Sequence, residues 1–170
     1  NGGGLSLVES HIIIKDVTIT NNHVSGNADC GGVLVGQSSP TFINVIISDN
    51  SAGHTGGICL SSSNAYFQNV SIENNIAIYG TGGLVCEYST PVFDGVEIHG
   101  NTATSSAGGA TFHNTCVPEV INSGLDIYNN LSEGDAGGLY IFRNYGQEYS
   151  NIKVYDNVAY DNGGGVYASS

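Results

Sequence analysis

Hydrophobic and polar residues alternate along this chain in short segments that are separated by Gly, Asn, Ser and Asp. One set has aliphatic residues two positions apart, at Val17–Ile19, Val45–Ile47, Val70–Ile72, Val96–Ile98, Leu125–Ile127 and Ile152–Val154. A second set follows pairs of glycines, at Val33–Val35, Ile58–Leu60, Leu84–Cys86, Ala110–Phe112, Leu139–Ile141 and Val166–Ala168. Period-two alternation predicts β-strands, and the intervening residues are typical of turns. The pattern excludes a helical fold.

The glycine pair itself recurs seven times, at intervals of 25 to 29 residues. These pairs are Gly3-Gly4, Gly31-Gly32, Gly56-Gly57, Gly82-Gly83, Gly108-Gly109, Gly137-Gly138 and Gly164-Gly165. Such a period is typical of a solenoid, whose units bury their apolar faces by stacking. A left-handed hexapeptide coil needs about 18 residues and a propeller blade about 40 to 45. The sequence therefore predicts a right-handed parallel β-helix of about six coils. We expect residues 1–170 to form a single β-helix segment of a longer repeat protein.

An asparagine stands three residues after the second aliphatic residue of each first-set segment. These residues are Asn22, Asn50, Asn75, Asn101, Asn130 and Asn157. In stacked coils about 4.8 Å apart, each side-chain amide can donate a hydrogen bond to the amide carbonyl of the next coil. Asparagine also tolerates the left-handed backbone of a tight turn. We therefore interpret this row as a structural asparagine ladder inside the solenoid.

The repeat also resembles that of a known family. Ile-x-x-Asn-x-Ala followed by Gly-Gly-aliphatic occurs at Ile47–Ala52, Ile72–Ala77 and Ile98–Ala103 and in the glycine pairs after them. This pattern is similar to the Phe-x-x-Asn and Gly-Gly-Ala-aliphatic repeats of chlamydial polymorphic membrane proteins. An aliphatic residue replaces their Phe, and only Gly108-Gly109-Ala110 keeps the alanine. The resemblance implies a surface-displayed adhesive β-helix.

Composition narrows the partners that this chain could bind. It has three basic and fifteen acidic residues and a net charge of −12. Such a charge disfavours nucleic acid, anionic membranes and acidic polysaccharides as partners. No apolar run approaches the roughly 20 residues of a membrane span. We expect an extracellular or cell-surface location, and partners that are other protein chains, copies of the same chain or glycans.

Four cysteines lie in successive repeats, at Cys30, Cys59, Cys86 and Cys116. An even number of cysteines in a chain of extracellular character is compatible with disulfides. Counted from the second glycine of their repeats, however, no two share a position. Cys59 is expected to point outward and Cys86 inward, so the sequence leaves the pairing open. Their spacing does not indicate a zinc site.

The outward positions of the first set of strands contain the chain's one predicted cluster of ionisable residues. Glu97 and Asp126 are expected on adjacent coils, with Glu73 diagonal to them and His99 alongside. One interpretation is a catalytic carboxylate pair or a calcium site, as in pectin-degrading enzymes of β-helix fold. The other is a solvated face whose charge Lys153 offsets. We expect the second, with no cofactor and no metal, and keep the first as the alternative.

Two further features bear on recognition. Tyr128 and Tyr155 are predicted on the same outer face, where exposed aromatic rings could stack on sugars or pack against a partner. The sequons Asn69-Val70-Ser71 and Asn130-Leu131-Ser132 are possible glycosylation acceptors, and Asn69 is the better candidate because Asn130 belongs to the ladder.

From these features together we hypothesise that the chain is a non-enzymatic structural or adhesive segment. A pectate-lyase-like enzyme and a carbohydrate-binding module are the alternatives.

Overall fold

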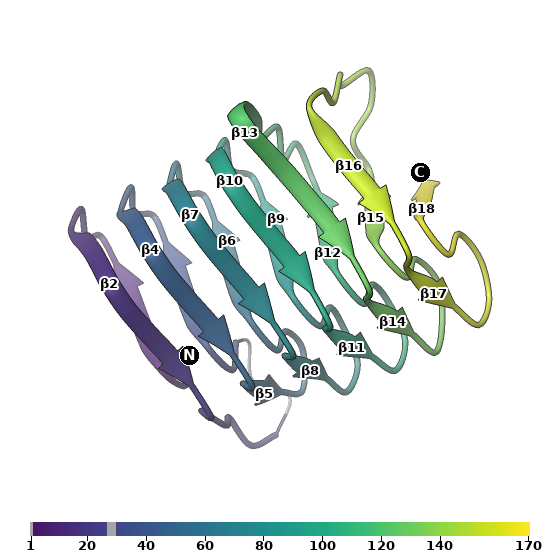
Figure 1. Ribbon diagram of the computed structural model, residues 1–170, viewed down its shortest axis with the longest axis horizontal. Helices are drawn as coiled ribbons and strands as arrows, with labels where there is room; N and C mark the ends of the chain where they lie inside the picture. Colours follow the sequence, from purple (N-terminus) through teal and green to yellow (C-terminus); the bar gives the residue numbers. More distant parts are fainter. Residues whose placement is uncertain (1, 27–29) are drawn as a thin grey trace.

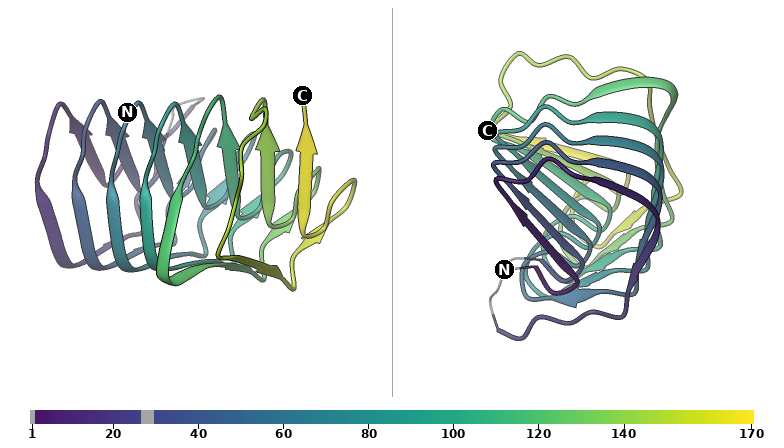
Figure 2. Two further views of the ribbon diagram at one scale, coloured as in Figure 1. Left: turned by 90° about the horizontal axis from the view of Figure 1, so that it is seen from above. Right: turned by 90° about the vertical axis from the view of Figure 1, so that its left-hand side faces the viewer.

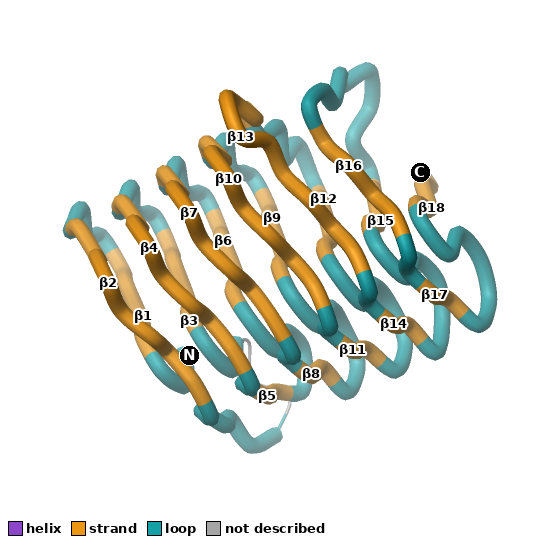
Figure 3. The backbone as a smooth tube through the Cα atoms, in the orientation of Figure 1, coloured by secondary structure: helices purple, strands orange, loops and turns teal. Residues whose placement is uncertain are grey.

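The fold consists of strands and turns wound into successive coils (Figures 1 and 3). The computed structural model describes residues 2–26 and 30–170, and none of these residues is helical. Asn1 and residues 27–29 lie outside this description. The coils stack side by side from the N-terminal to the C-terminal region, and the view along the stack shows them nearly superimposed (Figure 2).

The strands of the described residues form three parallel sheets. The seven-stranded sheet contains β1 (Leu5–Val8), β3 (Val33–Gly36), β6 (Ile58–Ser61), β9 (Leu84–Glu87), β12 (Ala110–His113), β15 (Leu139–Phe142) and β18 (Val166–Ser169). The six-stranded sheet, here called the long sheet, contains β2 (Ile13–Thr20), β4 (Thr41–Ser48), β7 (Tyr66–Glu73), β10 (Val92–His99), β13 (Glu119–Tyr128) and β16 (Ile152–Tyr155). The five-stranded sheet contains β5 (Ser51–Ala52), β8 (Ile76–Ala77), β11 (Thr102–Ala103), β14 (Leu131–Ser132) and β17 (Val158–Ala159).

Each strand pairs with its equivalent in the next coil, in the register that the repeat alignment predicts. Val45 pairs with Val70, and Val70 with Val96. Ile58 pairs with Leu84 in the seven-stranded sheet. The pairing is parallel throughout the described strands. The predicted parallel β-helix of about six coils is confirmed.

The core lies inside the coils and is built from rows of like residues. Phe42 and Phe67 are fully buried and stack with ring centroids 4.9 Å apart. Phe93 continues the row 5.3 Å from Phe67. The inward aliphatic residues of both strand sets, such as Ile47 and Ile72, are also fully buried. Burial of this apolar surface is the main source of stability, because no single coil can bury it alone.

The asparagine ladder that the sequence predicts is confirmed. Asn75 Nδ2 donates to Asn101 Oδ1 at 3.0 Å, and Asn101 Nδ2 donates to Asn130 Oδ1 at 3.0 Å. Each of these amides also donates to a main-chain carbonyl of the preceding coil, as Asn101 does to Ile72 at 2.9 Å. The same pattern runs from Asn22 to Asn157. Its four central members are almost completely buried.

The glycine pairs are required because two coils approach each other closely there. A Cβ atom on Gly57 would lie 2.4 Å from the carbonyl oxygen of Gly83 in the next coil. Such contacts are too short for any side chain, so only glycine fits between the coils.

Two segments depart from the regular coil. Asn122–Gly124 replace the single residue Gly95 between the paired positions of β10 and β13, which makes a bulge in the long sheet. The segment between β15 and β16 protrudes beyond the row of equivalent turns (Figure 1).

Candidate functional site

The long sheet is bent, and a groove lies along the bend. One residue in the middle of each of the strands β2, β4, β7 and β10 adopts the left-handed backbone conformation, at Asp16, Asn44, Asn69 and Gly95 (φ 52° to 69°). Asp, Asn and Gly are the residues that tolerate this conformation best. The sequence therefore bends these four strands at an equivalent point, where β13 has its bulge instead.

The outer face carries two rows of side chains in the predicted register. Glu97 on β10 pairs with Asp126 on β13, so the two carboxylates lie on neighbouring strands. The second row brings Glu73, His99 and Tyr128 together on β7, β10 and β13. This confirms the predicted arrangement of the outer positions, although it does not by itself assign them a function.

Both carboxylates of the pair are engaged by other side chains. Tyr128 Oη donates to Glu97 Oε2 at 2.8 Å. Lys153 Nζ lies 3.2 Å from both carboxylate oxygens of Asp126. General acid–base chemistry needs one carboxyl group that can hold a proton and one free carboxylate. Lys153 thus binds both oxygens of Asp126, and Tyr128 binds one oxygen of Glu97, which is the arrangement expected of a solvated, charge-balanced face.

Ser71, Glu73 and His99 form a small polar cluster beside the pair. Ser71 Oγ donates to Glu73 Oε2 at 2.7 Å and lies 3.2 Å from His99 Nε2. The same His99 nitrogen lies 3.0 Å from Glu73 Oε2. In a serine nucleophile relay, one ring nitrogen accepts the serine proton and the other donates to the acid. Here the serine and the acid share one nitrogen, so the cluster does not have relay geometry.

Aromatic rings form a continuous stack on the second row. The ring of Tyr128 lies between those of His99 and Tyr155, with centroids 4.9 and 5.0 Å away and interplanar angles of 11° and 6°. We call these three residues the ring stack. Burial, together with the hydrogen bond to Glu97, raises the pKa of Tyr128 to about 12. Because both faces of Tyr128 are covered, a sugar cannot stack on this ring.

A groove of about 560 Å³ lies along the bend of the long sheet. Its lining comes from β4, β7, β10 and β13 and contains Asn44, Val45, Ile46, Asn69, Val70, Ser71, Gly95, Val96, Glu97, Ser123 and Asp126. The carboxylate pair therefore forms part of a groove. The sequence predicted Glu97 and Asp126 on this face but not the role of Asn44 and Gly95. The feature that could have revealed these two residues is that each stands directly before an inward aliphatic residue.

Beside this groove, Asp94 holds the bulge of β13 in place. Its carboxylate accepts hydrogen bonds from Asn122 Nδ2 (3.0 Å), the Ser123 main-chain N–H (3.2 Å) and Tyr66 Oη (3.4 Å). The hydrogen bonds from Asn122 and Ser123 lower the pKa of Asp94 below its ordinary value. All of these contacts are internal, so Asp94 has a structural role: it fixes Ser123 at the edge of the groove.

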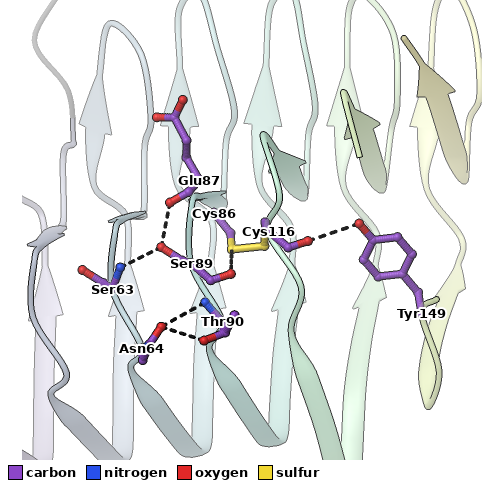
Figure 4. Close-up of a disulfide and its surroundings, with 8 residues drawn as sticks. All are labelled: Ser63, Asn64, Cys86, Glu87, Ser89, Thr90, Cys116 and Tyr149. Atoms are coloured by element: carbon purple, nitrogen blue, oxygen red, sulfur yellow. Dashed lines mark hydrogen bonds between the residues drawn. A yellow bond between two sulfur atoms is a disulfide. The ribbon is translucent and has the colours of Figure 1, made fainter. Parts of the chain in front are cut away.

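All four cysteines form disulfides, each between successive coils. Cys30 pairs with Cys59 and Cys86 with Cys116, with Cα atoms 6.0 and 5.7 Å apart. Figure 4 shows the second bond beside Ser89 and the carbonyl of Cys116, which accepts a hydrogen bond from Tyr149 at 3.2 Å. This pairing was left open by the sequence because the two members of each bond occupy different positions of the repeat.

A pair of threonines makes the same contact between repeat positions as the first disulfide. Thr81 and Thr111 occupy the same two repeat positions as Cys30 and Cys59, and their hydroxyl oxygens are 2.6 Å apart. The residue two before the second glycine thus contacts the residue two after it in the next coil. A row of serines at one like position of three repeats, Ser38, Ser63 and Ser89, is a further link that the sequence did not reveal. The main-chain N–H of each donates to the hydroxyl of the next, at 3.2 and 2.9 Å.

Other candidate sites differ in accessibility. Asn69 is exposed, whereas Asn130 is 1% exposed and takes part in the ladder, so only the first sequon is accessible in the folded chain. Among residues 2–26 and 30–170, no three His, Cys, Asp or Glu side chains are arranged to hold a metal ion. The described residues also contain no helix long and apolar enough to cross a membrane.

Three parallel sheets, inward ladders and coil-to-coil disulfides define a β-helix solenoid with a groove on one face. Residues 15–170 match the model of the family described as the right-handed β-helix region, and the chain belongs to this family. The match also agrees with the predicted handedness. No curated protein and no solved structure matched the chain in the corresponding searches.

Proposed function

We propose that this chain is a non-enzymatic structural or adhesive segment of an extracellular or cell-surface protein. The observation that carries the proposal is the linkage between coils. Every ladder asparagine, and all four cysteines, join one coil to the next. Disulfides form and persist in oxidising compartments, which supports an extracellular location. A stack tied together in this way is suited to holding a binding surface rigidly.

The resemblance to the repeats of chlamydial polymorphic membrane proteins supports an adhesive role for that surface. The pairing of Asp126 with Lys153 argues in the same direction, since both oxygens of this carboxylate already have a partner. The partners proposed for the surface are other protein chains.

The alternative is a carbohydrate-active enzyme that uses Glu97 and Asp126, with His99 nearby. The observation that favours it is the placement of the two carboxylates on neighbouring strands, within one groove. A calcium ion bound by the same carboxylates would belong to this alternative.

An adhesion assay combined with a turnover assay distinguishes these functions. Beads that carry the oxidised chain are tested for adhesion to a panel of purified extracellular proteins, with beads that carry the reduced and alkylated chain as control. The same preparation is assayed for product release from neutral and acidic polysaccharides, with and without calcium. We expect adhesion to at least one protein and no product release. Turnover that disappears in the Glu97→Gln, Asp126→Asn double variant would establish the enzyme instead.

A further inference from the structure

The groove on the long sheet marks a break in a second ladder, on the outside of the coils. Asn44 Nδ2 donates to Asp16 Oδ1 at 2.8 Å, and Asn69 Nδ2 donates to Asn44 Oδ1 at 3.3 Å. The next coil has Gly95 at this position. A Cβ atom there would be crowded, 3.2 Å from both Asn69 Oδ1 and Ser123 Cβ, so only glycine leaves the Asn69 oxygen uncovered on this side, where both residues line the groove. The ladder stops, and Asn69 Oδ1 receives no hydrogen bond from the following coil.

Two acceptor atoms near Gly95 have no donor from the described part of the chain. Asn69 Oδ1 borders Gly95, and Glu97, two residues after Gly95, lines the same groove. Glu97 accepts from Tyr128 through Oε2, whereas its Oε1 makes no hydrogen bond within the described part of the chain. A carboxylate and an amide oxygen call for an occupant that donates hydrogen bonds and carries positive charge.

The groove also has an apolar wall. Ile46 on β4 lines it and is 41% exposed, in an outward row whose next members, Ser71 and Glu97, are polar. An occupant with an aliphatic stem and a cationic head would cover Ile46 and place its charge toward Glu97. Among protein side chains, arginine fits this description best, because its planar guanidinium has five donors and can bind two acceptors at once.

The net charge of the whole chain decides where that arginine comes from. With a net charge of −12 and only three basic residues, two copies of the chain repel each other. One of the three, Lys153, is already paired with Asp126. We infer that the groove around Gly95 receives an arginine side chain from a basic segment of a different protein. This inference rests on the proposed adhesive function and names the partner's chemistry.

Two variants and a matched control test this site. Gly95→Asn introduces the residue that the two preceding coils have at this left-handed position, and its side chain, crowded between Asn69 and Ser123, covers the Asn69 oxygen. Glu97→Gln removes the charge but keeps an oxygen for Tyr128. Glu133→Gln removes the same charge from an exposed position outside the groove. Circular dichroism and thermal melting establish that all three variants are folded.

The probe is a fluorescein-labelled Gly-Arg-Gly-Arg-Gly peptide, with a matched peptide that contains citrulline in place of arginine. Citrulline has nearly the same shape as arginine but no charge. Binding is measured by fluorescence anisotropy at 0.15 M salt. We expect Gly95→Asn and Glu97→Gln to weaken arginine-peptide binding about tenfold, the loss typical of one charge-assisted hydrogen bond. Glu133→Gln should change it less than about twofold.

Three results would overturn the inference. The citrulline peptide could bind as tightly as the arginine peptide, Gly95→Asn could bind like the parent chain, or Glu133→Gln could weaken binding as much as Glu97→Gln. The last result would mean that net charge, and not the groove, attracts the peptide. If the beads still adhere to a protein while any of these results is obtained, the adhesive function stands and only the arginine site is refuted.

Discussion

Each ladder asparagine makes contacts in two directions at once. Asn101 accepts a hydrogen bond from Asn75, and donates to Asn130 and to the carbonyl of Ile72. The side chain is fully buried, so no water can replace these partners. The residue before each ladder asparagine is Asn, Asp or Gly and has a positive φ, as at Asn74 and Gly100. The turn is thus specified by two adjacent residues.

Removing one ladder side chain tests this arrangement. We expect Asn101→Ala to lower the free energy of unfolding by about 1–3 kcal/mol, because it leaves a buried amide and a carbonyl without partners. Denaturant unfolding followed by circular dichroism measures the loss. The control is Asn162→Ala, at an exposed residue whose side chain donates to Asp135. Equal effects of the two substitutions would show that the ladder contributes no more than a surface contact.

Tyr128, the central residue of the ring stack, makes the stability of the fold depend on pH in the alkaline range. Burial raises the pKa of Tyr128 to about 12, above the ordinary value of 10.0. Below pH 10 the Tyr128 phenol keeps its proton in both the folded and the unfolded chain. Between pH 10 and 12 the unfolded chain loses this proton while the folded chain keeps it, so this contribution to stability falls as pH rises.

A comparison with Tyr128→Phe isolates that contribution. The parent chain should lose more stability between pH 10 and 12 than the variant, in denaturant titrations at each pH. Ultraviolet absorbance of the folded chain should show one tyrosine fewer that ionises near pH 12 in the variant. Identical pH profiles for the two proteins would contradict the assignment of the shift to Tyr128.

At the scale of the strand, the apolar pattern predicts the structure well because its cause is local. An alternating strand repeated at a constant interval can bury its inward rows only by in-register stacking, so the pairs of the long sheet follow from counting residues. The outward neighbours Glu97 and Asp126 follow from the same register. So does the contact of Lys153 with Asp126, because the two are partners in the same register. The hydrogen bond from Tyr128 to Glu97 does not follow, because it runs diagonally across coils through a rotamer that the sequence does not encode.

The disulfides and the groove were less predictable for geometric reasons. Each disulfide joins positions that differ between coils, so alignment of the repeats separates the two cysteines of a pair. The groove depends on Gly95, which in the sequence is one of 25 glycines. Its meaning appears only when the left-handed positions of Asn44 and Asn69 are seen beside it.

The disulfides should contribute unequally to different parts of the stack. Replacing Cys86 and Cys116 together by Ser removes a link that closes a loop of 30 residues, and we expect a loss of about 2–4 kcal/mol. Hydrogen exchange should then increase around β9 and β12 more than around β3 and β6. The Cys30→Ser, Cys59→Ser variant is the matched control and should show the opposite distribution. A uniform increase in both variants would mean that the coils unfold as one unit.

Repulsion among the acidic residues of the whole molecule opposes the stacking of its coils. Fifteen acidic residues face three basic ones, and the stack brings Glu97 beside Asp126 on neighbouring strands. The repulsion between such groups is long-ranged at low salt, where the Debye length is about 30 Å at 0.01 M, and falls when it shrinks to about 8 Å at 0.15 M. The folded solenoid concentrates these charges more than the unfolded chain does, so added salt should favour folding.

We therefore expect the melting temperature to rise by about 2–4 °C between 0.01 and 0.15 M NaCl, equivalent to roughly 1 kcal/mol in a chain of this size. Lys153→Gln provides the matched test, because Lys153 is 70% exposed and neutralises Asp126 in the parent chain. Without this cation the melting temperature should be lower at 0.01 M and should rise more steeply with salt. A melting temperature that falls with salt would show that attraction between opposite charges, and not repulsion among carboxylates, dominates the electrostatics of the stack.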